Sequence, residues 1–155
     1  DVIVPPHTIM KLIQDDKPIV GGLYYNRHRP DTPVPRKIEG IDEQGRIRLR
    51  LPTKEELSAG ELVEVDAIGM GCTLIHTSVF KDIEYPWFRW TIPSNELDWK
   101  KRLHMEPIKP FSEDYYFCIK ARQAGYKIYV DTSLKCRHVS VNYMGGDGKI
   151  EFLEF

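Results

Sequence analysis

Residues 111–140 read FSEDYYFCIKARQAGYKIYVDTSLKCRHVS, and this stretch organises the rest of the chain. Ser112 is a good N-cap for a helix, and Glu113 and Asp114 fall in the first turn. There, unpaired N–H groups and the positive end of the helix dipole favour negative charge. Apolar residues recur at near-helical spacing until Gly125, a residue type that often follows the last helical turn. The stretch predicts a helix that begins with two acidic side chains.

Two strands are expected after this helix. Residues 126–130 are aromatic and β-branched, residues 131–133 are an Asp-Thr-Ser turn, and residues 134–141 form a second strand that carries His138. Since α/β folds gather their chemistry at helix N-termini and strand ends, the acidic pair and His138 are candidates for one crevice. An acidic helix cap and an ordinary packed or surface histidine explain the same residues, so both interpretations stay open.

The first 25 residues predict a β-α-β unit. Residues 2–4 have the composition of the end of a buried strand, Pro5-Pro6 breaks it, a short helix covers residues 8–14, and residues 18–25 form the next strand. The apolar side of the helix consists of Ile9, Leu12 and Ile13. Such units build parallel sheets under helices, so the expected fold class is α/β.

The middle of the chain is less regular. Residues 26–60 carry several prolines and many charges and are expected to be a variable excursion from the sheet. Within them, residues 45–51 alternate between arginine and apolar side chains, which is typical of a half-exposed edge strand. Two further strands are predicted, at residues 61–68 and 72–76.

Glycines interrupt these strand patterns at two places. Gly21 and Gly22 lie inside the second strand, where they either let another group approach the backbone or mark a bulge. Gly69 and Gly71 separate two strand segments and let the backbone come close to a ligand or to another strand.

An aromatic run follows at residues 85–90, with sequence YPWFRW. The indoles of Trp87 and Trp90 suit the hydrophobic core, and they equally suit stacking on the C–H face of a sugar ring. Both interpretations remain open at this point.

The composition fits one soluble domain. A chain of 155 residues with 41% hydrophobic residues can bury a core, so residues 1–155 are expected to form a single domain. The formal net charge of -1 argues against a broad footprint for nucleic acid or anionic membranes. No apolar run reaches the ~20 residues that span a bilayer. Three widely spaced cysteines match no disulfide framework or metal pattern, which favours a reducing, cytoplasmic setting.

Several segments in this order resemble a known family. They are KPIVGGLYY (17–25), VDAIGMGCTLIHTSVF (65–80), PWFRW (86–90) and SEDYYFCIKARQAGYKIYVDTSLKCRH (112–138). Together they resemble the metal-dependent half of GT-A fold glycosyltransferases, especially the large inverting family 2. The resemblance implies a partial GT-A fold, a Rossmann-like mixed sheet flanked by helices. It also implies that the nucleotide-binding half lies upstream. Because the chain starts at Asp1 in strand-like sequence and without a methionine, we expect it to be part of a longer protein.

The resemblance also implies a divalent metal. Asp1 matches the last aspartate of the family's D-x-D motif, and His138 matches the histidine that completes the metal site in many relatives. A sugar nucleotide leaves as a diphosphate, whose developing charge a hard divalent ion neutralises. Mg²⁺ or Mn²⁺ suits such a site, and an imidazole ligand favours Mn²⁺.

The same resemblance implies roles for the remaining residues. Asp114 is expected to be the general base that takes a proton from the acceptor hydroxyl, with Glu113 contacting the acceptor or ordering the loop. Gly69 and Gly71 would border the donor sugar. Trp87 would contact the acceptor together with Trp90.

The function expected from the sequence is transfer of a sugar from a nucleotide-sugar donor to a hydroxyl of a glycan or other acceptor. The chain would supply the base and part of the metal site, and it would be weak or inactive alone. Two alternatives remain. One is a non-catalytic carbohydrate- or protein-binding module, and the other is a metal-dependent nucleotide-sugar hydrolase that uses water as the acceptor.

Overall fold

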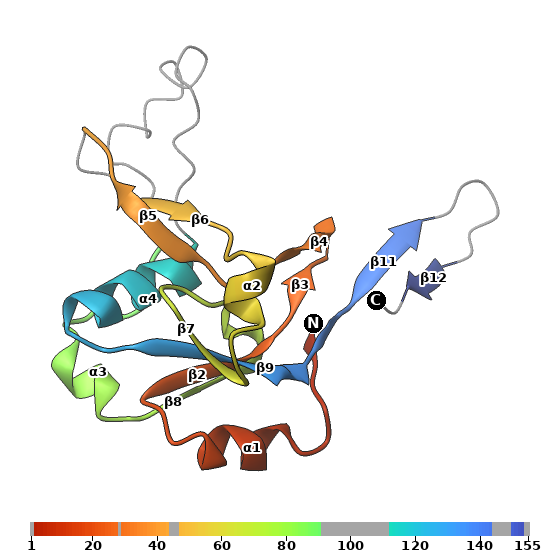
Figure 1. Cartoon of the computed structure of the whole chain (residues 1–155), viewed down its shortest axis with the longest axis horizontal. Helices are drawn as coiled ribbons and strands as arrows, with labels where there is room; N and C mark the ends of the chain where they lie inside the picture. Colours follow the sequence, from red (N-terminus) through yellow and green to blue (C-terminus); the bar gives the residue numbers. More distant parts are fainter. Residues whose placement is uncertain (1, 28, 44–46, 91–111, 144–149, 154–155) are drawn as a thin grey trace.

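The centre of the molecule is a mixed four-stranded sheet with few helices around it (Figure 1). The computed structural model describes residues 2–27, 29–43, 47–90, 112–143 and 150–153. The strand order is β7 (Leu62–Val65), β9 (Ile128–Lys135), β2 (Ile19–Leu23) and β8 (Thr73–Ile75). Strands β2 and β9 are parallel, and the other two pairs are antiparallel. The chain is therefore a mixed α/β protein, which confirms the broad fold class predicted from the sequence.

Helices cover both faces of this sheet. Helix α4 (Glu113–Gln123) packs on one face through Phe117 and Cys118, which cluster with Ile19 and Ile128 of the strands. Helix α1 (Thr8–Gln14) packs on the other face through Leu12. The two helices lie on opposite sides of the sheet (Figure 1). Strand β2 is buried at every position, as expected for a strand that both layers cover.

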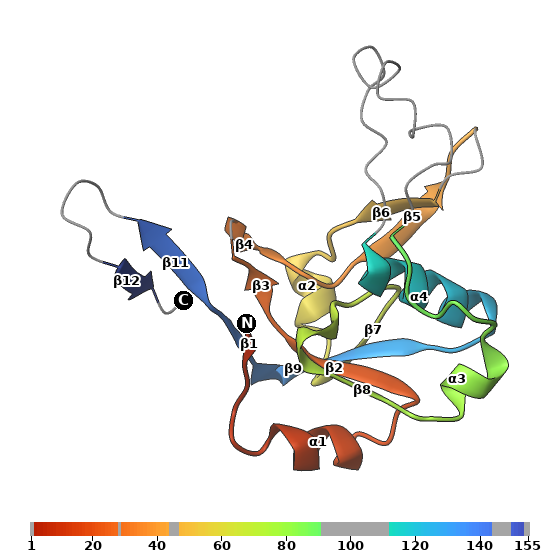
Figure 2. The same cartoon turned by 180° about the vertical axis from the view of Figure 1, so that it is seen from behind.

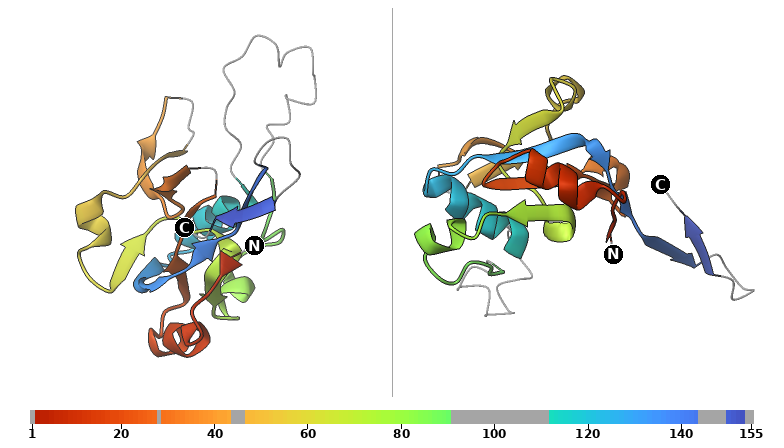
Figure 3. Two further views of the ribbon diagram at one scale, coloured as in Figure 1. Left: turned by 90° about the vertical axis from the view of Figure 1, so that its right-hand side faces the viewer. Right: turned by 90° about the horizontal axis from the view of Figure 1, so that it is seen from below.

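Small hairpins and short helices lie outside the central sheet and do not extend it, and the β11–β12 hairpin projects away from it (Figures 2 and 3). The hairpins pair β3 (Tyr25–Asn26) with β4 (Arg29–Pro33), β5 (Lys37–Ile41) with β6 (Ile47–Arg50), and β11 (Ser140–Tyr143) with β12 (Ile150–Leu153). The short helices are α2 (Lys54–Leu57), the 3-10 turn η1 (Met70–Cys72) and α3 (Val79–Asp82). Strand β6 confirms the strand predicted within residues 45–51. No helix in the described ranges is long and apolar enough to cross a membrane.

The predicted helix at residues 112–124 is confirmed. The Ser112 hydroxyl caps it by accepting a hydrogen bond from the Tyr115 backbone N–H at 3.4 Å. Gly125 follows the helix with φ +89°, a left-handed conformation that favours glycine. Local sequence signals therefore place both ends of α4 correctly.

The predicted β-α-β unit is wrong. Strand β1 (Val2–Ile3) pairs antiparallel with β10 (Arg137–His138) and takes no part in the central sheet. The parallel neighbour of β2 is β9, far downstream in the sequence. Strand β1 is also poorly buried, since Ile3 is 51% exposed. Its apolar composition reflects a short ladder at the margin of the fold.

The predicted apolar side of α1 is wrong by part of a turn. Thr8 and Leu12 are the buried residues of this helix, whereas Ile9 is 70% and Ile13 is 54% exposed. Positions 8 and 12 lie one above the other on a helix, so this pair faces the sheet. The Thr8 hydroxyl is satisfied because it donates to the Pro5 carbonyl at 2.7 Å.

The predicted turn at residues 131–133 does not separate two strands, because β9 includes these residues, although its pairing with β2 shifts register between Asp131 and Lys135. Asp131 lies opposite Gly22 of β2 and is fully buried. Its Oδ1 accepts hydrogen bonds from the backbone N–H and the hydroxyl of Ser133, at 2.8 and 2.7 Å. The Asp-Thr-Ser sequence makes the local hydrogen bonds that are typical of a turn, and they coincide with an irregularity in the strand pairing.

Candidate functional site

Asp114 joins the start of α4 to the glycine turn of residues 69–71. Its Oδ2 accepts a hydrogen bond from the Met70 backbone N–H at 3.2 Å. Burial raises the pKa of Asp114, the Met70 N–H opposes this effect, and the charge of Glu113 adds to it, so that the net pKa is above its ordinary value. A carboxylate with a raised pKa is a stronger proton acceptor. The environment of Asp114 therefore makes its carboxylate more basic than that of an exposed aspartate.

Glu113 adds a second feature at the same helix start. Its Oε2 is buried and has no hydrogen-bond partner in the part of the chain that the structure describes. Buried carboxylate oxygens are usually paired, so this atom still requires a polar partner. Adjacent helical residues project in different directions, so Glu113 and Asp114 do not form a pair of carboxylates across one bond.

The glycine turn is packed tightly against Tyr24. The Gly71 N–H donates to the Tyr24 hydroxyl at 3.1 Å. A Cβ atom at Gly69 would lie 2.2 Å from that hydroxyl, and one at Gly71 would lie 2.6 Å from Cγ2 of Val2. These contacts give a packing reason for both glycines, and they fill the space on the Cβ side of the turn with protein atoms.

His138 also packs against Tyr24. The two rings meet edge to face with centroids 5.7 Å apart. The Nδ1 atom of His138 lies 2.9 Å from the Tyr25 carbonyl oxygen. Since a carbonyl can only accept, Nδ1 carries the proton and Nε2 is the nitrogen left for a ligand. Backbone hydrogen bonds of this kind orient histidines that bind metals.

Tyr24 therefore contacts two of the predicted parts of the site, the glycine turn and His138. Burial raises its pKa to about 12, against the effect of the Gly71 N–H and with a further contribution from the charge of Asp114. The phenol stays protonated at physiological pH. No motif marks Tyr24 in the sequence, and the available signal is its position near the end of the strand predicted at residues 18–25.

The described residues form no metal centre by themselves. They contain no group of three His, Cys, Asp or Glu side chains that could hold an ion. Val2 lies opposite His138 in the β1–β10 ladder, but Asp1, the other predicted ligand, lies outside the described residues. His138 fits the role of one ligand, and a complete ligand set is not formed within the described ranges.

A small pocket opens beside His138. Its volume is about 80 Å³, far below the ~300 Å³ or more of typical ligand pockets, so the described residues enclose room for a few waters but not for a nucleotide sugar. The lining residues are Tyr25, Asn26, Arg27, Pro30, Cys136 and His138.

Trp87 and Trp90, the two predicted aromatic contacts, differ in how they pack. The Trp87 indole N–H donates to the Ile83 carbonyl at 3.0 Å, and its ring packs on Phe80 with centroids 5.1 Å apart. Trp90 is 58% exposed. Between them, Phe88 stacks on Phe117 of α4 with centroids 4.8 Å apart. The aromatic run is thus attached to the helix that carries Asp114, and Tyr85 and Trp90 are its most exposed rings.

Comparison of the sequence with protein-family models and with curated proteins gives no match.

Proposed function

We propose that this chain is the acceptor-side portion of a metal-dependent, inverting GT-A glycosyltransferase, in which Asp114 is the general base. The observation that carries the proposal is the hydrogen bond from the Met70 N–H to Asp114. It fixes a half-buried carboxylate against the glycine turn that the family resemblance places beside the donor sugar. The raised pKa of Asp114 suits a group that must accept a proton from a hydroxyl.

The other residues take roles around this base. Glu113 offers its unpartnered buried Oε2 to an acceptor hydroxyl. Trp90 offers an exposed ring for the apolar face of a sugar, and Trp87 supports the segment through its bond to Ile83. Together they bind and orient the acceptor while Asp114 removes its proton.

The proposal includes a divalent metal, with His138 as one of its ligands. Its Nε2 is free of the Tyr25 hydrogen bond, and the resemblance adds Asp1, the residue before β1 in the sequence, as a second ligand. When bound, Mn²⁺ or Mg²⁺ would neutralise charge on a leaving diphosphate. The nucleotide-binding half would lie upstream of this sequence.

The test is sugar transfer by the chain and by a version extended at its N-terminus. UDP- and GDP-sugars are supplied with Mn²⁺ and a panel of glycan acceptors. We expect Asp114→Asn to lower kcat by ~10²–10⁴-fold. Donor affinity, measured by titration calorimetry, should hardly change. Asp16→Asn is the matched control, because Asp16 is an exposed aspartate just after α1, the helix that packs on the opposite sheet face from α4.

Full activity of Asp114→Asn would remove Asp114 as the base. Sugar release without any acceptor, at an unchanged rate, would favour the nucleotide-sugar hydrolase. Glycan binding that neither needs metal nor responds to Asp114→Asn would favour the non-catalytic binding module.

A further inference from the structure

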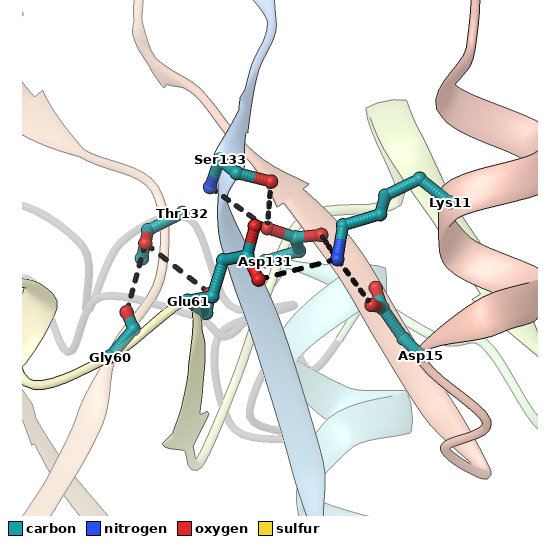
Figure 4. Close-up of polar contacts among 7 residues, drawn as sticks. All are labelled: Lys11, Asp15, Gly60, Glu61, Asp131, Thr132 and Ser133. Carbon is teal, nitrogen blue, oxygen red and sulfur yellow. Dashed lines mark hydrogen bonds and ion pairs between the residues drawn. The ribbon is translucent and has the colours of Figure 1, made fainter.

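A polar cluster lies between α1 and β9, on the sheet face that α1 covers (Figure 4). Its centre is the Lys11 ammonium, which lies 3.2 Å from Asp15 Oδ1, 3.4 Å from Asp131 Oδ2 and 3.6 Å from Glu61 Oε2. We call these four residues the Lys11 cluster. Its members come from three separate segments: α1 with its C-cap residue Asp15, the residue before β7, and β9.

The Lys11 cluster contains three carboxyl groups and one ammonium, and two of the carboxyls are buried. Asp131 is fully buried and Asp15 is 7% exposed. The Glu61 side chain is 63% exposed, so water solvates most of its charge. If both aspartates were ionised, two buried carboxylates would face a single ammonium. Removing an unpaired charge from water is costly, so one negative charge should be neutralised.

Two carboxyl oxygens mark where the neutralising proton could bind. Asp15 Oδ2 and Asp131 Oδ2 are buried and make no well-aligned hydrogen bond among the described residues, although the Lys11 ammonium lies 3.4 Å from Asp131 Oδ2 as its ion-pair partner. The other oxygen of each carboxyl is satisfied, by Lys11 in Asp15 and by Ser133 in Asp131. Ionised carboxylates only accept hydrogen bonds, so a proton on one of these two carboxyls is needed for one to donate to the other.

We propose that Asp15 and Asp131 share one proton, which joins α1 to β9 through a carboxylic acid–carboxylate hydrogen bond beside Lys11. Asp15 holds the proton and Asp131 keeps the charge. Asp131 is the better anion because it also accepts two hydrogen bonds from Ser133.

The two pKa values are displaced in opposite directions. Burial raises the pKa of Asp15, Lys11 opposes this effect, and the neighbouring Asp131 reinforces it. Burial also favours neutral Asp131, but the hydrogen bonds of Ser133 and the charge of Lys11 outweigh it and lower its pKa. The stability from Asp15 is thus present at low pH and lost as pH rises through its raised pKa. The stability from Asp131 is present above its ordinary pKa and lost as pH falls through its lowered one.

The test follows the carboxyl carbons of ¹³C-labelled aspartate by NMR during a pH titration of the chain. Asp15→Asn and Asp131→Asn assign the two signals. We expect one buried carboxyl to titrate above the ordinary value of about 3.9 and its partner to titrate below it. Two buried carboxyls that both titrate at the ordinary value would overturn the proposal.

Urea unfolding across the same pH range supplies a second readout. While the folded chain alone holds the Asp15 proton, its unfolding constant should rise up to about tenfold per pH unit. Asp15→Asn should abolish that dependence, because the amide N–H donates permanently to Asp131. The matched control is Asp16→Asn, which changes the neighbouring exposed aspartate and should keep the wild-type profile. A profile of Asp15→Asn parallel to that of wild type would also overturn the proposal.

The unfolding constants of the two variants show which aspartate holds the proton. Asp131→Asn removes the anion that Lys11 and Ser133 hold, so its unfolding constant should exceed that of Asp15→Asn. The reverse order would show that the proton resides on Asp131 and would refute the assignment.

Discussion

Gly22→Ala tests the packing between β2 and the segments that lead to the candidate site. An added Cβ would lie 2.7 Å from Cys136 Sγ and 3.1 Å from both Cys72 Sγ and the Leu134 carbonyl oxygen. Without these contacts, alanine in a strand interior would be favoured over glycine by about 0.5–1 kcal/mol. Overpacking of a filled core costs about 1–3 kcal/mol and should decide the sign.

The backbone around Gly22 has little freedom to move away. The Cys136 N–H donates to the Leu23 carbonyl at 2.8 Å, which fixes β9 against β2 beside the glycine. We therefore expect Gly22→Ala to lower the free energy of unfolding by about 1–3 kcal/mol. At roughly 2–4 °C per kcal/mol, the melting temperature should fall measurably.

Urea unfolding and calorimetry measure this effect. Gly40→Ala is the matched control, because a Cβ at Gly40 meets nothing within 4 Å, and its stability should stay within about 0.5 kcal/mol of wild type. In Gly22→Ala/Cys136→Ala, the closest clash is removed, so the two changes should couple favourably by about 0.5–3 kcal/mol. A Gly22→Ala protein as stable as the Gly40→Ala control, or strict additivity in the double variant, would refute the reasoning.

Three further predictions concern α4 and the residues around the glycine turn. Asp114→Asn keeps an acceptor for the Met70 N–H and removes a disfavoured charge, so its unfolding free energy at pH 7 should match or exceed wild type. Asp114→Ala should lose about 1–3 kcal/mol, and equal losses in the two variants would contradict this account. Tyr24→Phe leaves the Gly71 N–H without its acceptor and should cost about 1–3 kcal/mol in urea unfolding; unchanged stability would show that this bond contributes nothing. Phe117→Ala removes a fully buried ring that contacts Phe80 and Phe88 and should cost about 3–5 kcal/mol, a loss that a value below 1 kcal/mol in the same assay would exclude.

Local sequence signals were sufficient wherever neighbours in the chain determine the structure. The helix of residues 8–14 and the Ser112 cap, acidic first turn and Gly125 stop of α4 depend on contacts within a few residues. Sheet order depends on pairing between β2 and β9, which lie more than 100 residues apart in the chain. No local pattern encodes that pairing, so the β-α-β prediction joined β2 to the wrong strand.

The candidate site shows the same division. The acidic pair and His138 were recognisable as residue types, but the residue that lies between their segments, Tyr24, carries no motif. Its role depends on three contacts from distant segments, with Gly69, Gly71 and His138. Asp131 was assigned to a turn because Asp-Thr-Ser is typical of turns, and its ion pair is with Lys11 from another segment.

Strand β9 links the Lys11 cluster to the candidate site. Asp131 lies within β9, and the same run of chain continues into β10, which carries His138. At the other end, α1 follows β1, which pairs with β10. The start of the chain is therefore held to this run at two places, by the Lys11 cluster and by the Val2–His138 pairing. Because both attachments fix the backbone that carries His138, loosening α1 should shift the histidine against Tyr24. The stability of α1 and the geometry of the candidate site are for this reason properties of one connected structure.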